Sequence, residues 1–220
     1  VLCSTCGENP KCQGGPGVAR ERRMALSQVA VVTDSTASLP AEMYERYQIT
    51  MVPYYVHFPD RATRDMVDIK PQQFCDYLTA LPDNATLPKS ANPGVGDYLT
   101  AFAAAAERAC HIVSIHMTSV GSGAYQAALI AKEMAAQRLR GVRIEVVDTR
   151  NVSMCHGWIA LQAARAAAQG ATLDDVLDLV RRMIPVTRML QTADTLRYLY
   201  MGGRIGRAKH LMGSLLSIKP

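Results

Sequence analysis

The sequence predicts an α/β fold in which a mostly parallel sheet is flanked by helices. Short runs rich in β-branched residues alternate with longer amphipathic or alanine-rich segments from about residue 28 to residue 184. Strands and helices that alternate in this way pair in parallel through right-handed crossovers. The chain has 220 residues, of which 49% are hydrophobic, and is long enough for one domain and part of a second.

The expected elements follow one another in strand–helix order. The run 28–33 is β-branched and ends in Asp-Ser-Thr, which predicts a buried strand followed by a helix cap. The segment 81–93 carries three prolines and predicts a loop. Apolar spacing or alanine content predicts helices at 39–47, 71–81, 94–109, 123–139, 153–170, 173–184, 196–200 and 208–216. Apolar runs predict the remaining strands at 49–58, 111–117, 142–147 and 187–192.

The basic charge is concentrated at the C-terminal end. The net charge is +5, and residues 181–220 hold eight basic residues and one acidic residue. Such a patch suits nucleic acid, an acidic membrane or an acidic protein, and a solvated face is the plain alternative. Tyr198 and Tyr200 flank an apolar helical pattern, so we expect no nucleic-acid binding. No apolar run has the length of a spanning helix, so we expect no stable membrane insertion.

Cysteine usage predicts a reducing compartment and therefore a cytoplasmic protein. Cys75, Cys110 and Cys155 lie singly in apolar or helical contexts and are expected to be small buried hydrophobic residues. Residues 1–23 hold three further cysteines in a C-x2-C-x5-C pattern that lacks a fourth zinc ligand within the segment. The five histidines show no metal-site spacing either. We expect neither a metal nor a cofactor.

Ser122 lies between two glycines where a predicted strand meets a predicted helix. Thr118, Ser119, Gly121 and Gly123 belong to the same turn. Unpaired N–H groups and the helix dipole favour an anion at a helix start. The turn lacks the third glycine of a dinucleotide fingerprint and the serine spacing of a nucleophile elbow. We therefore expect these residues to form an anion site, with a simple helix cap as the alternative.

Six short blocks are distributed over most of the chain. They read TDSTASLP at 33–40, PKSANP at 88–93, TSVGSGAY at 118–125, DTRNVSM at 148–154, GGRIG at 202–206 and LLSIKP at 215–220. In kind and in order these blocks resemble the DegV family of bacterial fatty-acid-binding proteins. The resemblance runs from about residue 29 to residue 220 and covers nothing before Met24.

The resemblance implies specific roles for three residues. Ser122 matches the serine whose hydroxyl holds the fatty-acid carboxylate. Ser90 aligns with the hydroxyl residue, usually threonine, that opens the family's T-S-Q-P block; here the block reads S-A-N-P, and the second hydroxyl is lost to Ala91. Arg204, in the glycine-rich block, is associated in the family with the partner kinase and the phosphorylated head group.

The resemblance also implies the function of the whole protein. A long-chain fatty acid is bound with its acyl tail in an apolar tunnel, and a separate ATP-dependent fatty acid kinase phosphorylates its carboxylate. The acyl phosphate then feeds phospholipid synthesis. The chain itself is thus expected to be the lipid-binding subunit and not an enzyme.

The same resemblance sets the expected domains. Residues 24–171 are expected to form a first DegV-like α/β domain, and residues 172–220 the beginning of a second, incomplete α/β domain. The chain is thus expected to be truncated at its C-terminus. Residues 1–23 are rich in Gly, Pro and Arg and are expected to be a disordered or spurious extension.

A function of another class remains as the alternative. An α/β enzyme could act on a small carboxylate or phosphorylated substrate at the same loops. It would need a base or nucleophile beside Ser122, and the sequence places no His or Lys there. Asp34 and Asp148 each end a predicted strand, and we expect them to orient loops and not to act as acid and base.

Overall fold

The computed structural model describes residues 27–82, 85–190, 192 and 197–205. The chain divides into two compact units, one ending at Thr187 and the other beginning at Arg188. The predicted N-terminal extension and the predicted helix 208–216 lie outside the described residues, so both remain predictions.

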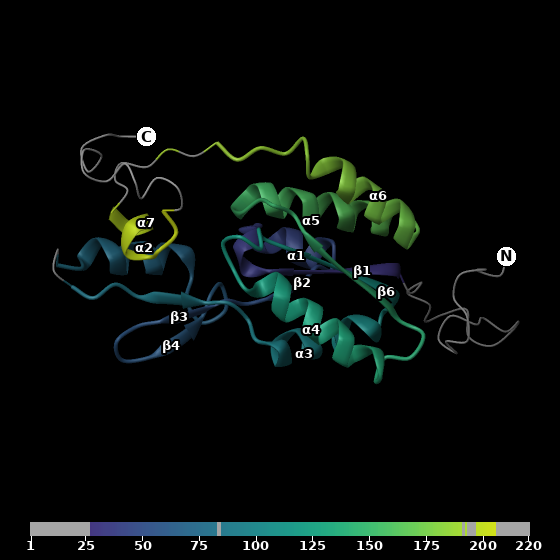
Figure 1. The fold of residues 1–220 in the computed structure, drawn as a ribbon, viewed down its shortest axis with the longest axis horizontal. Coiled ribbons are helices and arrows are strands. Elements are labelled where there is room, and N and C mark those ends of the chain that lie inside the picture. Colours follow the sequence, from purple (N-terminus) through teal and green to yellow (C-terminus); the bar gives the residue numbers. More distant parts are fainter. Residues whose placement is uncertain (1–26, 83–84, 191, 193–196, 206–220) are drawn as a thin grey trace, which may run out of the picture. The chain divides into compact units, whose positions relative to one another are not determined.

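A four-stranded parallel sheet forms the centre of the first unit, as the sequence predicted. Its strands are β1 (Ser27–Asp34), β2 (Thr50–Val52), β6 (Ala109–His116) and β7 (Arg143–Asp148), in the order β2-β1-β6-β7 (Figure 1). β6 is buried along its whole length because helices cover both faces of the sheet. Since all four strands are parallel, their carboxyl ends lie at the same edge.

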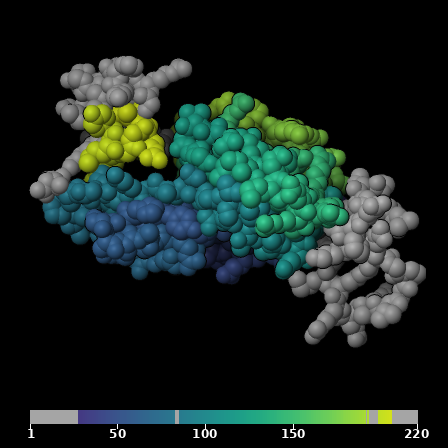
Figure 2. Space-filling model, turned by 60° about the horizontal axis from the view of Figure 1, so that its bottom comes forward, coloured from purple at the N-terminus to yellow at the C-terminus, as the bar shows by residue number. Residues whose placement is uncertain are grey.

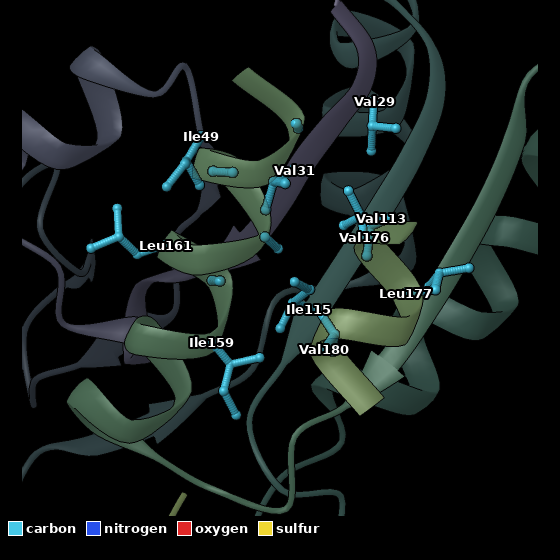
Figure 3. Packing of buried hydrophobic residues seen from close by; sticks show 14 of the residues in the cluster. Val29, Val31, Ile49, Val113, Ile115, Ile159, Leu161, Val176, Leu177 and Val180 are labelled. Carbon is cyan, nitrogen blue, oxygen red and sulfur yellow. The ribbon is translucent and has the colours of Figure 1, made fainter. Parts of the chain in front are cut away.

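One face of the sheet is covered by α5 (Ser153–Ala168), α6 (Leu173–Met183) and the short α1 (Ala41–Arg46). In Figure 3 the sheet residues Val113 and Ile115 lie among apolar side chains of α5 and α6. These helices match the predictions at 153–170, 173–184 and 39–47.

A glycine lets α5 come close to the loop after β1. That loop forms the 3-10 turn η1 (Ser35–Ala37). A Cβ atom on Gly157 would stand 2.1 Å from the carbonyl oxygen of Ala37, so a side chain cannot fit without moving backbone. The packing of α5 thereby fixes the position of η1.

The opposite face is covered by α3 (Val95–Ala106) and α4 (Ala124–Ala136). Figure 2 shows this face, with the teal and green side chains of these helices over the sheet. Fully buried alanines let the helices approach the sheet closely, and Tyr98 and Phe102 fill the remaining space.

A second, antiparallel sheet corrects two predictions. Its strands are β4 (Ala62–Arg64), β3 (Tyr55–His57) and β5 (Lys89–Ala91), in the order β4-β3-β5. The predicted strand 49–58 is thus two short strands, because the chain leaves the parallel sheet after β2 and β3 joins a different sheet. The predicted loop 81–93 contains β5, which was not recognised because three residues are too few to show a period.

The remaining elements complete the first unit and begin the second. α2 (Pro71–Ala80) follows the second sheet, and α6 packs on α5, so the first unit extends past residue 171. The described residues 187–190 and 192 form no strand, which corrects the prediction at 187–192. In the second unit the described residues include α7 (Arg197–Met201). That this unit begins an incomplete α/β domain remains a prediction.

Candidate functional site

The loops that carry the predicted site follow β1, β6 and β7. They therefore lie at the carboxyl edge of the parallel sheet, where α/β sheets bind their ligands. The loop after β6 contains Thr118 to Gly123, and the loop after β7 contains Thr149 to Val152.

The loops after β6 and β7 are tied together by hydrogen bonds. The Thr118 N–H donates to the Asn151 carbonyl oxygen at 2.8 Å, and the Ser119 N–H donates to Asp148 Oδ2 at 3.2 Å. The other oxygen of Asp148 accepts from the Arg150 N–H at 2.8 Å. Asp148 therefore orients loops, as predicted. The backbone N–H groups of Thr118 and Ser119 thus bind other residues of these loops. A role of Thr118 or Ser119 in ligand binding remains a prediction.

Ser122 lies just before α4, and its hydroxyl contacts both the first turn of the helix and the side chain of Tyr54. The Ala124 N–H donates to Ser122 Oγ at 3.2 Å, and Ser122 Oγ lies 2.5 Å from Tyr54 Oη. The residue in the N-cap position is Gly123, whose backbone begins the helix without a side-chain cap. Ser122 is half-buried, and its hydroxyl supports the start of α4.

Tyr54 is a contact of Ser122 that sequence reasoning missed. Its side chain is 8% exposed, and its N–H donates to Ser35 Oγ at 3.1 Å. The next residue, Tyr55, donates its hydroxyl to Asp97 Oδ1 at 3.0 Å. A buried tyrosine hydroxyl usually has a hydrogen-bond partner, so the sequence could have indicated that Tyr54 has one. The sequence could not indicate that the partner is Ser122.

The segments 88–93 and 118–125 meet, but through residues other than the two serines. A Cβ atom on Gly123 would stand 3.1 Å from Asn92 Oδ1, so a side chain there would require Asn92 to shift by a few tenths of an ångström. Ser90 lies in β5 opposite Val56, with an exposed side chain. The convergence of Ser90 and Ser122 on one anion remains a prediction.

Arg204 lies in the second unit, directly after α7. α7 ends at Met201, and Gly203 in the turn after it has a φ of +71°, the left-handed conformation that favours glycine. The exposed guanidinium of Arg204 donates from Nη1 to the Gly202 carbonyl oxygen at 2.7 Å. The glycine-rich block therefore forms a helix C-cap, and the role of Arg204 toward a partner remains a prediction.

A group of buried polar side chains joins β1 to β6 at this edge. We call Asp34, His116, Ser114, Thr33 and His156 the buried network. His116 Nδ1 lies 3.1 Å from Asp34 Oδ2, and His116 Nε2 lies 2.7 Å from Ser114 Oγ. His156 Nε2 lies 2.9 Å from Thr33 Oγ1 and 3.0 Å from the carbonyl oxygen of residue 115. All five side chains belong to fully buried residues.

The buried network is ionised at its centre. Burial opposes the charge, but the hydrogen bond from His116 and the nearby imidazole of His156 hold the pKa of the Asp34 carboxyl below its usual range. Burial lowers the pKa of His156, against the opposing attraction of Asp34. Asp34 also accepts from the Thr36 N–H at 3.0 Å and so caps η1, which confirms that it orients a loop.

Ser114, His116 and Asp34 are arranged in the order nucleophile, base and acid of a hydrolase triad. Ser114 is nevertheless wholly buried in the middle of the sheet, so no substrate can reach its hydroxyl. We read these three residues as a structural connection between β1 and β6.

Several other sequence predictions can be compared with the described part of the chain. It contains no group of three or more His, Cys, Asp or Glu side chains placed to hold a metal, and no helix long and apolar enough to cross a membrane. Cys75 is exposed on α2 and Cys155 is half-buried, which corrects two of the three expected buried cysteines. Cys110 is buried as expected but is disulfide-bonded, so it is not a single free cysteine.

Two cavities of the first unit lie at the amino-terminal edge of the sheet. One is lined by residues that include Val29, Gln48 and Arg108, and the other by residues that include Arg143 and Asp174. Both are remote from the carboxyl ends of the strands. The predicted acyl tunnel corresponds to neither and remains a prediction.

The fold and the hydroxyl-bearing loops define an α/β protein of the class that binds ligands at the carboxyl edge of a parallel sheet. The family model described as "Uncharacterised protein, DegV family" matches residues 28–220, and the chain belongs to this family. It is 31% identical over 195 residues to a DegV domain-containing protein of Caldanaerobacter subterraneus, covering 89% of this chain and 67% of the relative. It is 36% identical to a DegV domain-containing protein of Streptomyces coelicolor, covering 87% of this chain and 66% of that relative.

Solved structures resemble the chain over a similar span. One shows fatty acid binding by a DegV family protein from Thermus thermophilus, with a TM-score of 0.75 and 31% identity over 88% of this chain and 66% of that one. Another is DegV, a fatty acid binding protein from Bacillus subtilis, with a TM-score of 0.75 and 28% identity over 88% of this chain and 67% of that one. The chain thus spans about two thirds of the length of the proteins it matches.

Proposed function

We propose that this chain binds one long-chain fatty acid, with the carboxylate at Ser122 and Ser90 and the acyl chain in an apolar tunnel. The observation that carries the proposal is the half-buried Ser122 hydroxyl at the start of α4, between Tyr54 and the Ala124 N–H. Relatives from Thermus thermophilus and Bacillus subtilis bind fatty acids and share this fold at 31% and 28% identity. Membership of the same family supports the same class of ligand.

The acyl chain and the carboxylate of such a ligand contribute differently to its binding free energy. Burial of an acyl chain contributes about 0.8 kcal/mol per CH2, so about sixteen carbons contribute on the order of 11 kcal/mol before ordering costs. A hydrogen bond to an ionised carboxylate adds about 1.5 to 3 kcal/mol. The acyl chain therefore supplies most of the affinity, and the hydroxyls select the head group and set its position.

We assign no catalysis to this chain. The partners of the Ser122 hydroxyl are a tyrosine hydroxyl and a backbone N–H, and neither is a general base at neutral pH. A nucleophilic serine needs such a base beside it. Phosphorylation of the bound carboxylate is assigned to a separate ATP-dependent kinase in the cytoplasm, and the acyl phosphate is proposed to feed phospholipid synthesis.

We assign Arg204 to the contact with that kinase. Its side chain is exposed and lies within the basic residues 181–220. Arg204→Ala is expected to leave fatty-acid affinity nearly unchanged and to weaken kinase association at low salt. Exposed charges are screened over about 8 Å at physiological ionic strength, so added salt should reduce wild-type association more than that of the variant. Loss of fatty-acid binding with intact association would contradict the assignment.

Native mass spectrometry of the chain purified from bacterial cells tests the main proposal. We expect a copurified long-chain fatty acid in the wild type and its depletion in Ser122→Ala. Thr100→Ala is the matched control, because among the described residues its exposed hydroxyl bonds to the Gly96 carbonyl oxygen within α3. A chain that carries no lipid and does not take up added palmitate would contradict the proposal, and a bound small phosphorylated compound would favour the α/β enzyme.

A further inference from the structure

The first of the two cavities at the amino-terminal edge combines an apolar wall with positive charge. Its volume is about 110 Å³, and it lies between β1 and the carboxyl ends of α1 and α5. The apolar residues of its lining are Val29, Ala30, Val31, Ala164, Ala167 and Ala168. The other described residues of the lining are Arg46, Tyr47, Gln48 and Arg108, and none of them is acidic.

Arg108 is held in the lining by neutral oxygen atoms. Its Nη2 donates to the Gln48 carbonyl oxygen at 2.8 Å and to Thr50 Oγ1 at 2.6 Å. Burial lowers the pKa of the Arg108 guanidinium, because the half-buried group has lost part of its hydration. An arginine nevertheless stays protonated, and neutral acceptors do not neutralise its charge. The group is therefore fixed in position with its charge uncompensated.

Arg46 adds a second positive charge to the same lining. It is exposed at the end of α1, and its Cζ lies 5.5 Å from the centroid of the Tyr47 ring. In the described part of the chain, no aspartate or glutamate forms an ion pair with Arg46 or Arg108. The second cavity differs, because Arg143 in its lining pairs with Asp174. Of the two cavities, the first is thus the one that suits an anion.

The size of the first cavity limits the ligand that it can hold. A cavity of about 150 Å³ admits benzene, so one of about 110 Å³ admits roughly four to six non-hydrogen atoms. A long acyl chain is therefore excluded. Guanidinium groups bind carboxylates and phosphates, and an apolar wall favours a ligand with a hydrocarbon part. A short-chain carboxylate has both features.

We propose that this cavity is a second ligand site, which binds a short-chain carboxylate such as butyrate. The carboxylate is bound by Arg46 and Arg108, and the hydrocarbon part lies against β1 and α5. Ser122 lies at the carboxyl edge of the sheet, and this cavity lies at the amino-terminal edge. The proposed fatty-acid site and the second site are thus separate, and either can exist without the other.

An NMR titration of the full chain, labelled with nitrogen-15 in a buffer free of phosphate and carboxylates, tests the proposal. Three probes separate charge from apolar contact: butyrate, the neutral butyramide of equal size, and inorganic phosphate. The amide signals of Val31 and Ala167 report on this cavity. The amide signal of Ala124 reports on the Ser122 loop.

Butyrate should shift the signals of Val31 and Ala167 with a Kd on the order of 1 mM. Butyramide and phosphate should each bind at least about tenfold more weakly, because one lacks the charge and the other the hydrocarbon part. Equal binding of butyramide would show that the arginines do not select the ligand, and equal binding of phosphate would overturn the assignment to a carboxylate. Shifts confined to Ala124 would place butyrate at the proposed fatty-acid site and overturn the second site.

Substitution of the two arginines completes the test. Arg46→Gln removes an exposed charge and should weaken butyrate binding about threefold, whereas Arg108→Gln should weaken it about tenfold. Arg61→Gln is the matched control, because Arg61 also lies over an aromatic ring, that of Phe58, but pairs with Asp60 outside the cavity. Wild-type butyrate affinity in a folded Arg46→Gln chain would overturn the proposal, even if Arg108→Gln fails to fold.

Discussion

The buried network and the Tyr54–Ser122 pair lie at the same edge of the sheet but differ in exposure. Every member of the buried network is enclosed, and its ionised Asp34 is hydrogen-bonded to His116 and to backbone. Ser122 is half-buried, and its hydroxyl is hydrogen-bonded to Tyr54 Oη and to the Ala124 N–H. The polar groups of the first arrangement fix the loops, and we have proposed that Ser122 of the second binds a ligand. Substitutions in the first should therefore affect stability, and substitutions in the second should affect binding.

The largest stability effect is expected from Asp34→Ala. Removal of the Asp34 carboxylate leaves the buried His116 ring and the Thr36 N–H without their acceptor, at a cost of about 1 to 3 kcal/mol for each. Urea unfolding followed by circular dichroism measures the free energy of unfolding. The control is Asp60→Ala, which breaks the exposed Asp60–Arg61 pair and should have little effect. Equal effects of the two substitutions would show that the buried network does not anchor the fold.

Gly157→Ala should come next. Its new methyl group would stand 2.1 Å from the Ala37 carbonyl oxygen, so α5 or η1 must move, at a cost of about 1 to 3 kcal/mol. Gly96→Ala in α3 is the matched control, because nothing lies within 4 Å of the added methyl group. That variant should raise stability by up to about 1 kcal/mol, since alanine favours a helix more than glycine does. A stabilising Gly157→Ala would contradict the close packing of η1.

Acidification should destabilise the buried network in two steps. The pKa of His156 is lowered in the folded chain, so the unfolded chain binds its proton more readily, and stability falls as the pH drops below the ordinary value of about 6.5. The pKa of Asp34 is also lowered, so its contribution is present above about 3.9 and is lost below that value. Thermal midpoints between pH 8 and pH 3 measure both steps. A midpoint that stays constant from pH 7 to pH 5 would contradict the assignment for His156.

The smallest stability effect and the largest binding effect are expected from Ser122→Ala. Loss of one bond at a helix start costs about 1 kcal/mol or less, because Gly123 begins the helix without it. Palmitate affinity should fall about tenfold or more, since a charge-assisted hydrogen bond is lost. Differential scanning fluorimetry and fluorescent-ligand displacement on the same sample compare the two effects. A folded Ser122→Ala chain with wild-type affinity would remove Ser122 from the site.

The sequence alone determined the parallel α/β fold and the family. Three local patterns carried this prediction: the β-branched runs near residues 30 and 113, the helical spacing of the segments between them, and the glycines around Ser122. Patterns of this kind depend on neighbouring residues only, so they indicate local structure. They placed Ser122 between a strand and a helix, and the six blocks identified the family. They also indicated correctly that Asp34 and Asp148 orient loops.

Only the tertiary structure decided which side chains meet. Tyr54 lies 68 residues from Ser122, and Asp34 lies 82 residues from His116. No periodicity links residues so far apart, because their proximity depends on strand order and on how closely helices pack, as at Gly157. The three-residue strands β2, β3 and β5 were misread for a related reason: such strands are assigned by their hydrogen-bonding partners and are too short to show a period of their own.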